Sequence, residues 1–406
     1  MVSHSGESNQ MSILDKKTKD VATVASLLAR TDAQQQAGGY ADTLREILQQ
    51  PATWRDTAGL LQDDTVRQRL AQALAANEGP IVLTGSGSSM YIGECLAPLL
   101  QAALGREARA IAGGTLLTHW RSVLPPQSGL LVSLARSGNS PESCGVVDRL
   151  LADAPAWHHL VITCNADGGL ATRYRDDARV SVLVLDERTN DRSLVMTSSF
   201  TNLLLAGSGL PPTAGIGAAA ARAGDAVSSM VDTHVGRLAE LARRDFDSAV
   251  YLGSGAALGA AHEGALKMLE MTGGQVVTMA ETFLGLRHGP MSSVHGTTLV
   301  VALLSGDPGV RGYEHDLLRE LSRKRLGLAT LLVGQDIPAD LVGPDDLAVD
   351  LALAGAGEVP TLLAQVVAGQ WLAFFRCLHL GGTPDAPSQG VLTRVVGEFT
   401  IHGSGT

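Results

Sequence analysis

The chain has 406 residues, of which 45% are hydrophobic and 18% charged, and its 31 basic and 41 acidic side chains give a formal net charge of −10. This composition is typical of a folded globular protein and excludes a disordered chain. The length predicts two or three domains or one duplicated unit. The acidic balance argues against a nucleic-acid partner, so an anionic ligand would need a local site.

Neither the beginning of the chain nor its most apolar stretch indicates a membrane. Residues 1–20 lack the apolar core of a secretory signal, so we expect a cytoplasmic protein. Residues 362–380 are apolar but contain Gln365, Gln370 and Arg376, which predicts an amphipathic or buried helix and no membrane partner. The four cysteines are scattered without a Cys-x-x-Cys pair, which argues against a metal site and a disulfide framework.

Two long segments share a sequence pattern at one constant offset, set by aligning Gly87 with Gly255. Each contains short runs of Val, Ile and Leu that alternate with helix-length segments, which predicts a parallel sheet with helices on both faces. We therefore interpret the chain as a duplicated α/β unit. The matching strings are 81–89 (IVLTGSGSS) with 250–257 (VYLGSGAA), 130–138 (LLVSLARSG) with 298–306 (TLVVALLSG), and 180–186 (VSVLVLD) with 348–354 (AVDLALA).

The repeat divides the chain into six expected segments. The helical segment before the first copy has four arginines against six acidic side chains, which argues against a DNA-binding head. In order, the segments are a polar arm (1–40), a helical segment (41–78), the first α/β copy (79–212), a linking helix (213–247), the second copy (248–382) and a C-terminal tail (383–406).

Two predicted strands of the first copy end in hydroxyl-rich turns that begin helices. The first turn contains Ser88 and Ser89, and the second contains Arg136, Ser137 and Ser140. Such turns present free backbone N–H groups and the positive end of a helix dipole, which suits a phosphate group. A third cluster, Thr197-Ser198, is expected to close the same pocket.

These serines could instead be ordinary helix caps, and Ser140 before Pro141 has the pattern of an N-cap. The second copy has Ala256-Ala257 and Asp307-Pro308 at the equivalent positions. Capping alone would predict similar residues in both copies, so we favour one anion site in the first copy. A dinucleotide fold fits poorly because both Gly-rich turns lack the third glycine of GxGxxG, and there is no Walker A lysine.

The helix expected over residues 258–274 places three charged side chains together. Glu263, Lys267 and Glu270 fall within an arc of about 60°, opposite an apolar side that includes Leu269. One interpretation is a solvated face with ordinary Glu–Lys pairs. Because Lys267 is the only lysine between Lys19 and Lys324, we favour a carboxylate base beside a fixed cation. A zinc-protease motif fails because the position of its second histidine is Leu266.

Together these features resemble the sugar-isomerase (SIS) domain family, specifically its branch of galactosamine-6-phosphate deaminases and tagatose-6-phosphate ketose/aldose isomerases. The resemblance implies two tandem SIS domains, each a three-layer αβα unit with a flavodoxin-like, parallel five-stranded sheet, followed by a tail that closes the active site. It begins near Thr43 and extends into the tail. It rests on the strings TLREILQQPATW, ARSGNSPES, ITCN, MTSSFTN, YLGSG, ALKMLEMTGG, LRHGP and GGTPDAPSQGVLTRVVGEFTIH.

The resemblance also implies roles for particular residues. Glu270 matches the base that moves a proton between C2 and C1 of the opened sugar, with Lys267 and Glu263 as the pair beside it. His288 matches a histidine that assists ring opening and is often supplied by a neighbouring subunit. Arg394 lies where a related synthase has a lysine in its closing tail. The implied phosphate-binding residues are Ser88, Ser89, Arg136, Ser137, Ser140, Thr197 and Ser198.

The implied activity is conversion of D-galactosamine 6-phosphate to D-tagatose 6-phosphate and ammonia through an enolamine, without a metal or organic cofactor. The alternatives are a glucosamine-6-phosphate deaminase, a plain tagatose-6-phosphate isomerase and a non-catalytic sugar-phosphate-binding protein. Met291 after HGP and Thr393 before Arg394 depart from the family pattern and bear on substrate identity. A glutamine-dependent synthase would need a glutaminase cysteine before Cys95. We expect a homodimer or a dimer of dimers with a shared active site.

Overall fold

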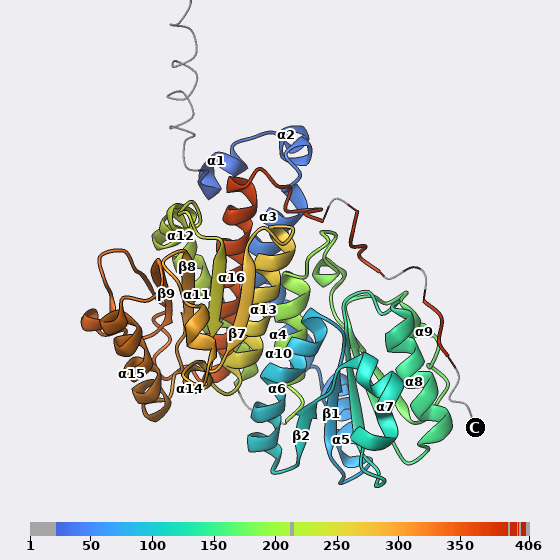
Figure 1. Cartoon of the computed structure of the whole chain (residues 1–406). Helices are drawn as coiled ribbons and strands as arrows, with labels where there is room; N and C mark the ends of the chain where they lie inside the picture. The colour runs from blue at the N-terminus through green and yellow to red at the C-terminus, as the bar shows by residue number, and fades with distance from the viewer. Residues whose placement is uncertain (1–21, 212–214, 389, 396, 398, 403–406) are drawn as a thin grey trace, which may run out of the picture.

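Two parallel five-stranded sheets form the framework of the computed structural model (Figure 1), which describes residues 22–211, 215–388, 390–395, 397 and 399–402. The strand order is β2-β1-β3-β4-β5 in the first sheet and β10-β9-β8-β6-β7 in the second. In each sheet the first strand therefore lies between the second and the third. The predicted α/β fold class with two parallel five-stranded sheets is confirmed.

The strands of the first sheet are β1 (Ile81–Thr84), β2 (Ala108–Ala110), β3 (Leu130–Ala135), β4 (His158–Thr163) and β5 (Val180–Val184). Those of the second are β6 (Ser248–Leu252), β7 (Val277–Glu281), β8 (Thr298–Leu303), β9 (Ala329–Gly334) and β10 (Leu347–Asp350). All residues of the central strands β3 and β8 are buried. Burial on both faces explains why their sequences are continuous apolar runs.

Helices cover both faces of the first sheet. Val132 faces a core shared with α6 and α10, whereas Leu131 packs on the opposite face against α7 and α8. This alternation follows from the period of two along a strand. The helices of this half are α6 (Ser88–Leu104), α7 (Gly113–Val123), α8 (Pro141–Asp153), α9 (Gly169–Thr172) and α10 (Ser198–Ser208), with a 3-10 turn at Glu187–Thr189.

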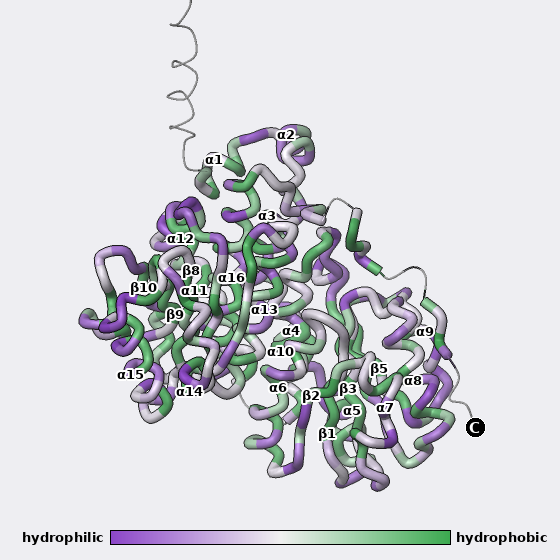
Figure 2. The backbone as a smooth tube through the Cα atoms, in the orientation of Figure 1, coloured by the Kyte–Doolittle hydropathy of each residue, from purple (hydrophilic) through white to green (hydrophobic). Residues whose placement is uncertain are grey.

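The second sheet has the same layered arrangement. Val301 faces the shared core, whereas Val300 packs on the other face with Leu317 and Leu321 of α15. Figure 2 shows that the strands and central helices are mainly hydrophobic in colour, with polar segments toward the periphery. The helices of this half are α13 (Ala257–Met271), α14 (Phe283–Leu286), α15 (Pro308–Lys324) and α16 (Glu358–His379), with 3-10 turns at Pro290–Ser293 and Ala339–Leu341.

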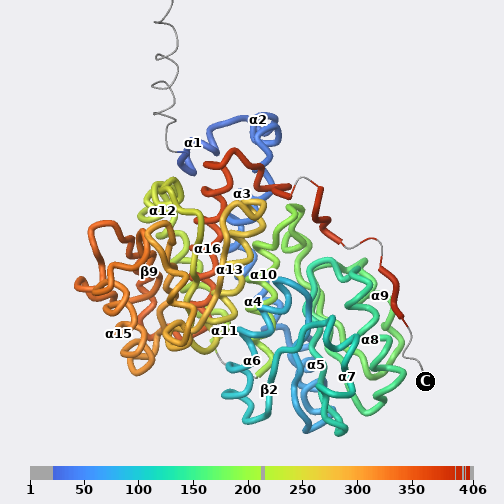
Figure 3. The backbone as a smooth tube through the Cα atoms, viewed as in Figure 1, coloured from blue at the N-terminus to red at the C-terminus, as the bar shows by residue number. Residues whose placement is uncertain are grey.

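Helix α16 is the central helix of the molecule and packs lengthwise against α13 (Figure 3). It is long and apolar enough to cross a membrane, but 94% of its most apolar window is buried inside the protein. Arg376, which interrupts its apolar sequence, donates hydrogen bonds to the carbonyl oxygens of Ala242, Arg244 and Phe246 at 3.0, 2.8 and 2.5 Å. These bonds satisfy a charge that is otherwise buried, and α16 is a core helix as predicted.

The N-terminal part contains more helix than the sequence pattern predicts. Residues 22–40, expected only as a polar arm, contain two short helices that begin at capping boxes of Thr23 with Ser26 and of Thr31 with Gln34. Leu27 is buried and anchors the first of them on the core. The five helices here are α1 (Val24–Leu28), α2 (Asp32–Ala37), α3 (Ala41–Leu48), α4 (Gln50–Gln62) and α5 (Asp64–Ala75).

The link between the two halves is two helices rather than the single one expected. They are α11 (Ile216–Thr233) and α12 (Val235–Leu241), and His234 between them departs from helical geometry with a φ of −123°. Helix α11 packs against α4 and α16. The link is therefore part of the shared core and holds the two halves together.

Candidate functional site

A cavity of about 300 Å³ lies at the carboxyl ends of β1 and β3, where the two halves meet the C-terminal tail. Its lining includes Ser88, Ser89, Arg136, Ser137 and Ser140 from the first half. The second half contributes two side chains of α13, Lys267 and Glu270, and the tail contributes residues 392–395. Crevices at the carboxyl ends of parallel strands are the usual ligand sites of such sheets.

A larger hollow of about 950 Å³ lies between α4, α5 and α11. It is lined mainly by aliphatic and amide side chains such as Leu61, Gln68 and Leu74, and it contains none of the predicted site residues. The chemistry of the smaller cavity makes it the candidate site.

The turn after β1 delivers two buried serines to the cavity. Gly87 precedes α6 with a φ of 56°, a left-handed conformation that favours glycine. Gly85 allows close approach, because a Cβ there would lie 2.5 Å from the Cβ of Ser89. No side chain caps the first turn of α6. Ser89 N and Met90 N donate to the carbonyl oxygens of Ser86 and Gly87 at 3.2 and 2.9 Å. The positive end of the helix dipole and the side chains of Ser88 and Ser89 therefore face the cavity, where they suit an anion.

The turn after β3 leaves a second helix N-terminus open. Ser140 is the N-cap residue of α8 and Pro141 occupies its first turn, as predicted, but the Ser140 side chain makes no capping hydrogen bond. At the equivalent helix of the second half, Asp307 caps α15 by accepting hydrogen bonds from the N–H groups of Gly309 and Val310. The anion position is therefore filled by the chain's own carboxylate in one half and open in the other.

Arg136 is buried at the floor of the cavity and is fixed by backbone acceptors. Its Nη1 donates to the carbonyl oxygens of Ser193, Leu194 and Val195 at 3.1, 3.0 and 3.3 Å. Its Nη2 donates to the carbonyl oxygen of Arg394 at 3.3 Å. Burial lowers the pKa of Arg136 from its ordinary value, yet a guanidinium of such high intrinsic pKa stays charged.

Helix α13 holds a buried cation between two carboxylates. Lys267 is 1% exposed, Glu263 is fully buried, and Lys267 Nζ lies 3.5 Å from Oε1 of Glu263. Lys267 Nζ also donates to Oε2 of Glu270, whose side chain is 22% exposed and lines the cavity. This arrangement excludes the interpretation of a solvated Glu–Lys face. The predicted packing of Leu269 is wrong, since that side chain is 40% exposed.

The ionisable groups of Glu263, Lys267 and Glu270 shift one another's pKa values. Burial raises the pKa of Glu263 to about 8, which Lys267 opposes and Glu270 reinforces. Burial would lower the pKa of Lys267, but Glu263 and Glu270 outweigh it and raise that pKa above its ordinary value. Lys267 is therefore a permanent cation next to the more accessible carboxylate, Glu270.

Arg394 reaches the cavity edge but does not present a free guanidinium. Its Nε donates to the carbonyl oxygen of Asp191 at 2.8 Å, and its Nη2 donates to the backbone and side-chain oxygens of Asn190. Thr393 Oγ1 donates to the carbonyl oxygen of Val395 at 2.7 Å. In this structure Arg394 therefore fixes the tail against the loop before α10.

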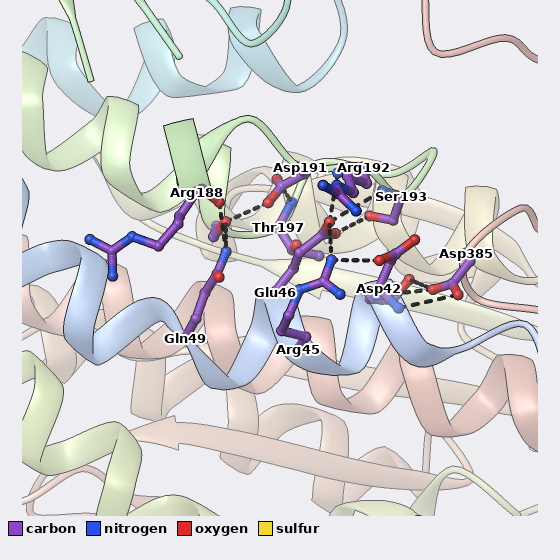
Figure 4. Close-up of polar contacts among 12 residues, drawn as sticks. Asp42, Arg45, Glu46, Gln49, Arg188, Asp191, Arg192, Ser193, Thr197 and Asp385 are labelled. Carbon is purple, nitrogen blue, oxygen red and sulfur yellow. Dashed lines mark hydrogen bonds and ion pairs between the residues drawn. The ribbon is translucent and has the colours of Figure 1, made fainter. Parts of the chain in front are cut away.

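Thr197 and Ser198 do not line the cavity, contrary to the prediction. Both are fully buried at the N-terminus of α10, and the carboxylate of Asp191 occupies the anion position there. Asp191 accepts hydrogen bonds from Thr197 N at 2.8 Å, from the Ser198 hydroxyl, and from Ser199 N and Oγ at 2.8 and 2.6 Å (Figure 4). The third hydroxyl cluster is thus closed by the chain itself.

His288 is exposed and lies outside the cavity lining of this chain. It follows α14 in a loop where Gly289 has a φ of 127°. Met291, in the same loop, is also outside the cavity lining. Within a single chain, therefore, the structure brings together Glu263, Lys267, Glu270 and the serine turns, but not His288.

Several site residues escaped the sequence analysis. Ser86 and Ser143 line the cavity and belong to the same hydroxyl-rich turns, so the strings themselves point to them. Asp191 and Glu46 lie near the cavity without lining it. The sequence around them does not indicate that Glu46 binds the loop that contains Asp191. In the described part of the chain, no group of three or more His, Cys, Asp or Glu side chains could hold a metal ion.

The raised pKa of Glu263 predicts a dependence of stability on pH. In the folded protein Glu263 keeps its proton up to about pH 8, whereas in the unfolded chain, where its carboxyl group has the ordinary pKa of 4.5, that proton has already been lost. The stability from this proton is fully present below the unfolded pKa and is lost as the pH rises through the folded pKa. We expect Glu263→Gln, which cannot ionise, to reduce the fall in the free energy of unfolding between about pH 5 and 9 in urea titrations.

Part of the fall in the free energy of unfolding with rising pH will remain in Glu263→Gln. The reason is that burial and Asp191 also raise the pKa of Glu46 to about 8. Glu240→Gln, which removes an exposed carboxylate on α12, is the matched control and should leave the slope unchanged. An equal slope in wild type and Glu263→Gln would contradict the assignment.

Comparisons with known proteins agree with the geometry, although no family model matches the chain. The chain is 35% identical over 392 residues to the D-galactosamine-6-phosphate deaminase AgaS of Shewanella sp., which covers 93% of this chain and 96% of that protein. It is 33% identical over 368 residues to the D-galactosamine-6-phosphate deaminase AgaS of Escherichia coli, which covers 89% and 95%. The solved tagatose-6-phosphate ketose/aldose isomerase from Escherichia coli has a TM-score of 0.80 at 31% identity and covers 89% and 96%. The chain belongs to the AgaS family of SIS-type sugar-phosphate enzymes.

Proposed function

We propose that this protein is a D-galactosamine-6-phosphate deaminase that forms D-tagatose 6-phosphate and ammonia. The observation that carries the proposal is the juxtaposition in one cavity of an accessible carboxylate, a buried cation and two uncapped helix N-termini. AgaS relatives that match nearly the whole chain support the choice of an amino sugar. A non-catalytic sugar-phosphate-binding protein would need the helix N-termini but not the charged set on α13.

The phosphate group is anchored by the first half of the chain. The N-termini of α6 and α8 both reach the cavity and neither has a side-chain cap. Ser88, Ser89, Ser137 and Ser140 supply hydroxyl donors around the same space. Binding of the phosphate group orients the sugar so that its C1 and C2 atoms are held beside the catalytic side chains. Such positioning accounts for much of the rate of enzymes of this kind.

Glu270 is the base of the proposed proton relay. It removes the proton from C2 of the open-chain amino aldehyde, and the aldehyde oxygen takes up a proton, which gives an enolamine. The same carboxyl then returns a proton to C1. Lys267, held beside Glu270, stabilises the negative charge that develops on oxygen in the transition state.

The amino group decides the outcome of the relay. Proton return to C1 leaves a ketimine at C2, and addition of water to that carbon releases ammonia and leaves the ketose. A 2-hydroxy sugar would pass through an enediol and give isomerisation only. The same residues therefore serve either reaction, and the substrate determines whether ammonia appears.

We also infer that the working enzyme is at least a homodimer in which His288 of a second copy assists ring opening. Its exposed position outside the cavity of its own chain supports this arrangement. An imidazole side chain can both donate and accept a proton, which suits proton transfer to a ring oxygen. The family resemblance of the LRHGP string supports the same role.

The function is tested by ammonia release from galactosamine 6-phosphate and glucosamine 6-phosphate, with tagatose 6-phosphate isomerisation measured alongside. We expect ammonia from the galacto sugar and a fall in kcat of about 10²–10⁴-fold for Glu270→Gln, which cannot accept the C2 proton. Sugar-phosphate binding should remain measurable by calorimetry in this variant.

The control variant is again Glu240→Gln, and its kcat should equal that of wild type. Isomerisation of the hydroxy sugar without ammonia from either amino sugar would overturn the deaminase assignment while leaving the base intact. Full turnover in Glu270→Gln would overturn the mechanism.

The phosphate anchor predicts a selective effect of Ser137→Ala. Loss of one hydroxyl donor should raise KM for galactosamine 6-phosphate about tenfold and leave the weak binding of unphosphorylated galactosamine unchanged. Ser305→Ala is the matched control, because Ser305 accepts from Asp307 N in the second half as Ser137 accepts from Asn139 N in the first. Equal losses for both sugars would mean that Ser137 does not contact the phosphate.

Sharing of the site between subunits predicts complementation. Glu270→Gln and His288→Ala should each be nearly inactive alone, because each homodimer lacks one group in both sites. After co-expression, random pairing puts the two variants together in roughly half of the dimers, and one of the two sites in each of these has both groups. The number of active sites is then roughly a quarter of that in wild type. Ammonia release from the mixture measures the recovery, and a mixture no more active than its components would exclude a shared site.

A further inference from the structure

A carboxyl group that the proposed mechanism does not use is buried directly behind the cavity. Glu46 lies on α3, is 1% exposed and does not line the cavity. It belongs to the TLREILQQPATW string, one of those that carry the family resemblance. Figure 4 shows Glu46 pointing from α3 toward the loop that contains Asp191, Arg192 and Ser193.

The carboxyl group of Glu46 holds this loop through three hydrogen bonds. Its Oε1 accepts from the backbone N–H groups of Arg192 at 2.6 Å and Ser193 at 3.3 Å. Its Oε2 accepts from the Ser193 hydroxyl. Three hydrogen bonds to one buried group fix a segment that has neither helix nor strand geometry here.

The other side of the same loop faces the cavity. The carbonyl oxygens of Ser193, Leu194 and Val195 are the acceptors of Arg136 Nη1. Arg136 and Leu194 both line the cavity. Only the backbone of this loop therefore separates Glu46 from Arg136 and the cavity.

Asp191 and the tail fix the beginning of the loop. The Asp191 carboxylate accepts from the first N–H groups of α10, and its carbonyl oxygen accepts from Arg394 Nε. Leu194 N donates to the carbonyl oxygen of Asp385 at 2.9 Å. The loop is thus held at both ends, and Glu46 holds its middle.

We propose that Glu46 is a positioning residue, which fixes loop 190–195 and through it the guanidinium of Arg136 beside the sugar phosphate. The proposal rests on the proposed function for the identity of the substrate. Its geometry depends only on the hydrogen bonds described above. Glu46 does not touch the reacting atoms and acts entirely through the backbone of the loop.

The protonation state of Glu46 changes these hydrogen bonds. The Ser193 hydroxyl has one proton but two acceptors in reach, Oε2 of Glu46 and the carbonyl oxygen of Val195 at 3.0 Å. When Glu46 is ionised, it accepts the hydrogen bond from the Ser193 hydroxyl. The carbonyl oxygen of Val195 then accepts only from Arg136 Nη1. Protonated Glu46 donates to Ser193 instead, which then donates to Val195 and competes with Arg136.

Burial raises the pKa of Glu46 to about 8, Asp191 reinforces this, and the hydrogen bonds from Ser193 and Arg192 oppose it. Arg45 Nη2, on the same helix, lies 3.7 Å from Oε1 of Glu46. We therefore expect the loop to be held most firmly above about pH 8. The other charged groups that face this region are Arg136, Glu187, Arg188, Arg192 and Arg394.

The test compares Glu46→Gln and Glu46→Ala with wild type in steady-state kinetics and in calorimetric binding of inorganic phosphate from pH 6.5 to 9. Alanine removes both acceptor oxygens and with them all three hydrogen bonds. We therefore expect KM for galactosamine 6-phosphate and the Kd for phosphate to rise about tenfold, with kcat changed less. Glutamine mimics the protonated acid: it keeps the acceptor for both N–H groups and can donate to Ser193. Its KM should match wild type at pH 7.

The pH profile separates positioning from a merely structural role. Wild type should gain affinity relative to Glu46→Gln as the pH rises through about 8, since glutamine cannot ionise. Glu263 titrates in the same range but is present in both proteins and cancels in the ratio. Glu240→Gln, which removes an exposed carboxylate on α12 far from this loop in the chain, should change neither quantity.

The proposal is overturned if Glu46→Ala lowers only the melting temperature and leaves KM and phosphate affinity unchanged. It is also overturned if Glu46→Gln keeps the wild-type pH profile, a comparison that stands even where the alanine variant does not fold. Absence of ammonia release by wild type would overturn the proposed function instead. The phosphate titrations would then still decide the role of Glu46.

Discussion

The burial of Lys267 is the constraint on which the rest of the site depends. An ammonium group that is 1% exposed is tolerated only beside groups that compensate its charge. On the same helix, the carboxylate of Glu270 accepts a hydrogen bond from Lys267, and Glu263 lies 3.5 Å from its Nζ. The three side chains fix the rotation of α13, which packs against α16 on one side and α6 on the other. The same rotation places Glu270 in the cavity, opposite the serine turns of the first half. The stability of the buried charge and the position of the base therefore have one cause.

The two halves share their strand order but not their chemistry. In both, a strand ends at a turn that begins a helix, so both have the backbone of an anion site. Asp307 occupies the N-terminus of α15, and Asp191 occupies that of α10, whereas α6 and α8 have no such carboxylate. The chain's own carboxylates thus neutralise the N-termini of α15 and α10, whereas the uncapped N-termini of α6 and α8 line the cavity. The open ends converge on one cavity, and this difference, rather than the number of serines, defines the binding site.

This contrast explains which features could be predicted from the sequence. Strands such as β3 and β8 are apolar on both faces, and a lone lysine at helical spacing from two glutamates is visible without a structure. Thr197 and Ser198 look like a third phosphate turn, but the competing carboxylate comes from Asp191, whose approach depends on the path of an irregular loop. The helices in residues 22–40 escaped prediction because they are short and depend on capping boxes and on the burial of Leu27. Helix α13 is buried on most of its surface, since Ala261, Ala265 and Met268 are buried as well as Glu263 and Lys267. The sequence pattern of an amphipathic helix therefore could not show that Leu269 lies on the exposed part.

Loop 190–195 shows why a site of this kind needs support from outside its lining. A guanidinium with free N–H groups would adjust its rotamer to any nearby anion, whereas Arg136 already donates to four carbonyl oxygens. Its position is therefore set by backbone, and the backbone is set by Glu46, Asp191 and the tail. Because such acceptors are neutral dipoles, they hold the arginine in place without cancelling its charge. The cavity consequently keeps a positive charge of fixed position beside the proposed phosphate position. The C-terminal tail helps to fix that charge through the carbonyl oxygen of Arg394.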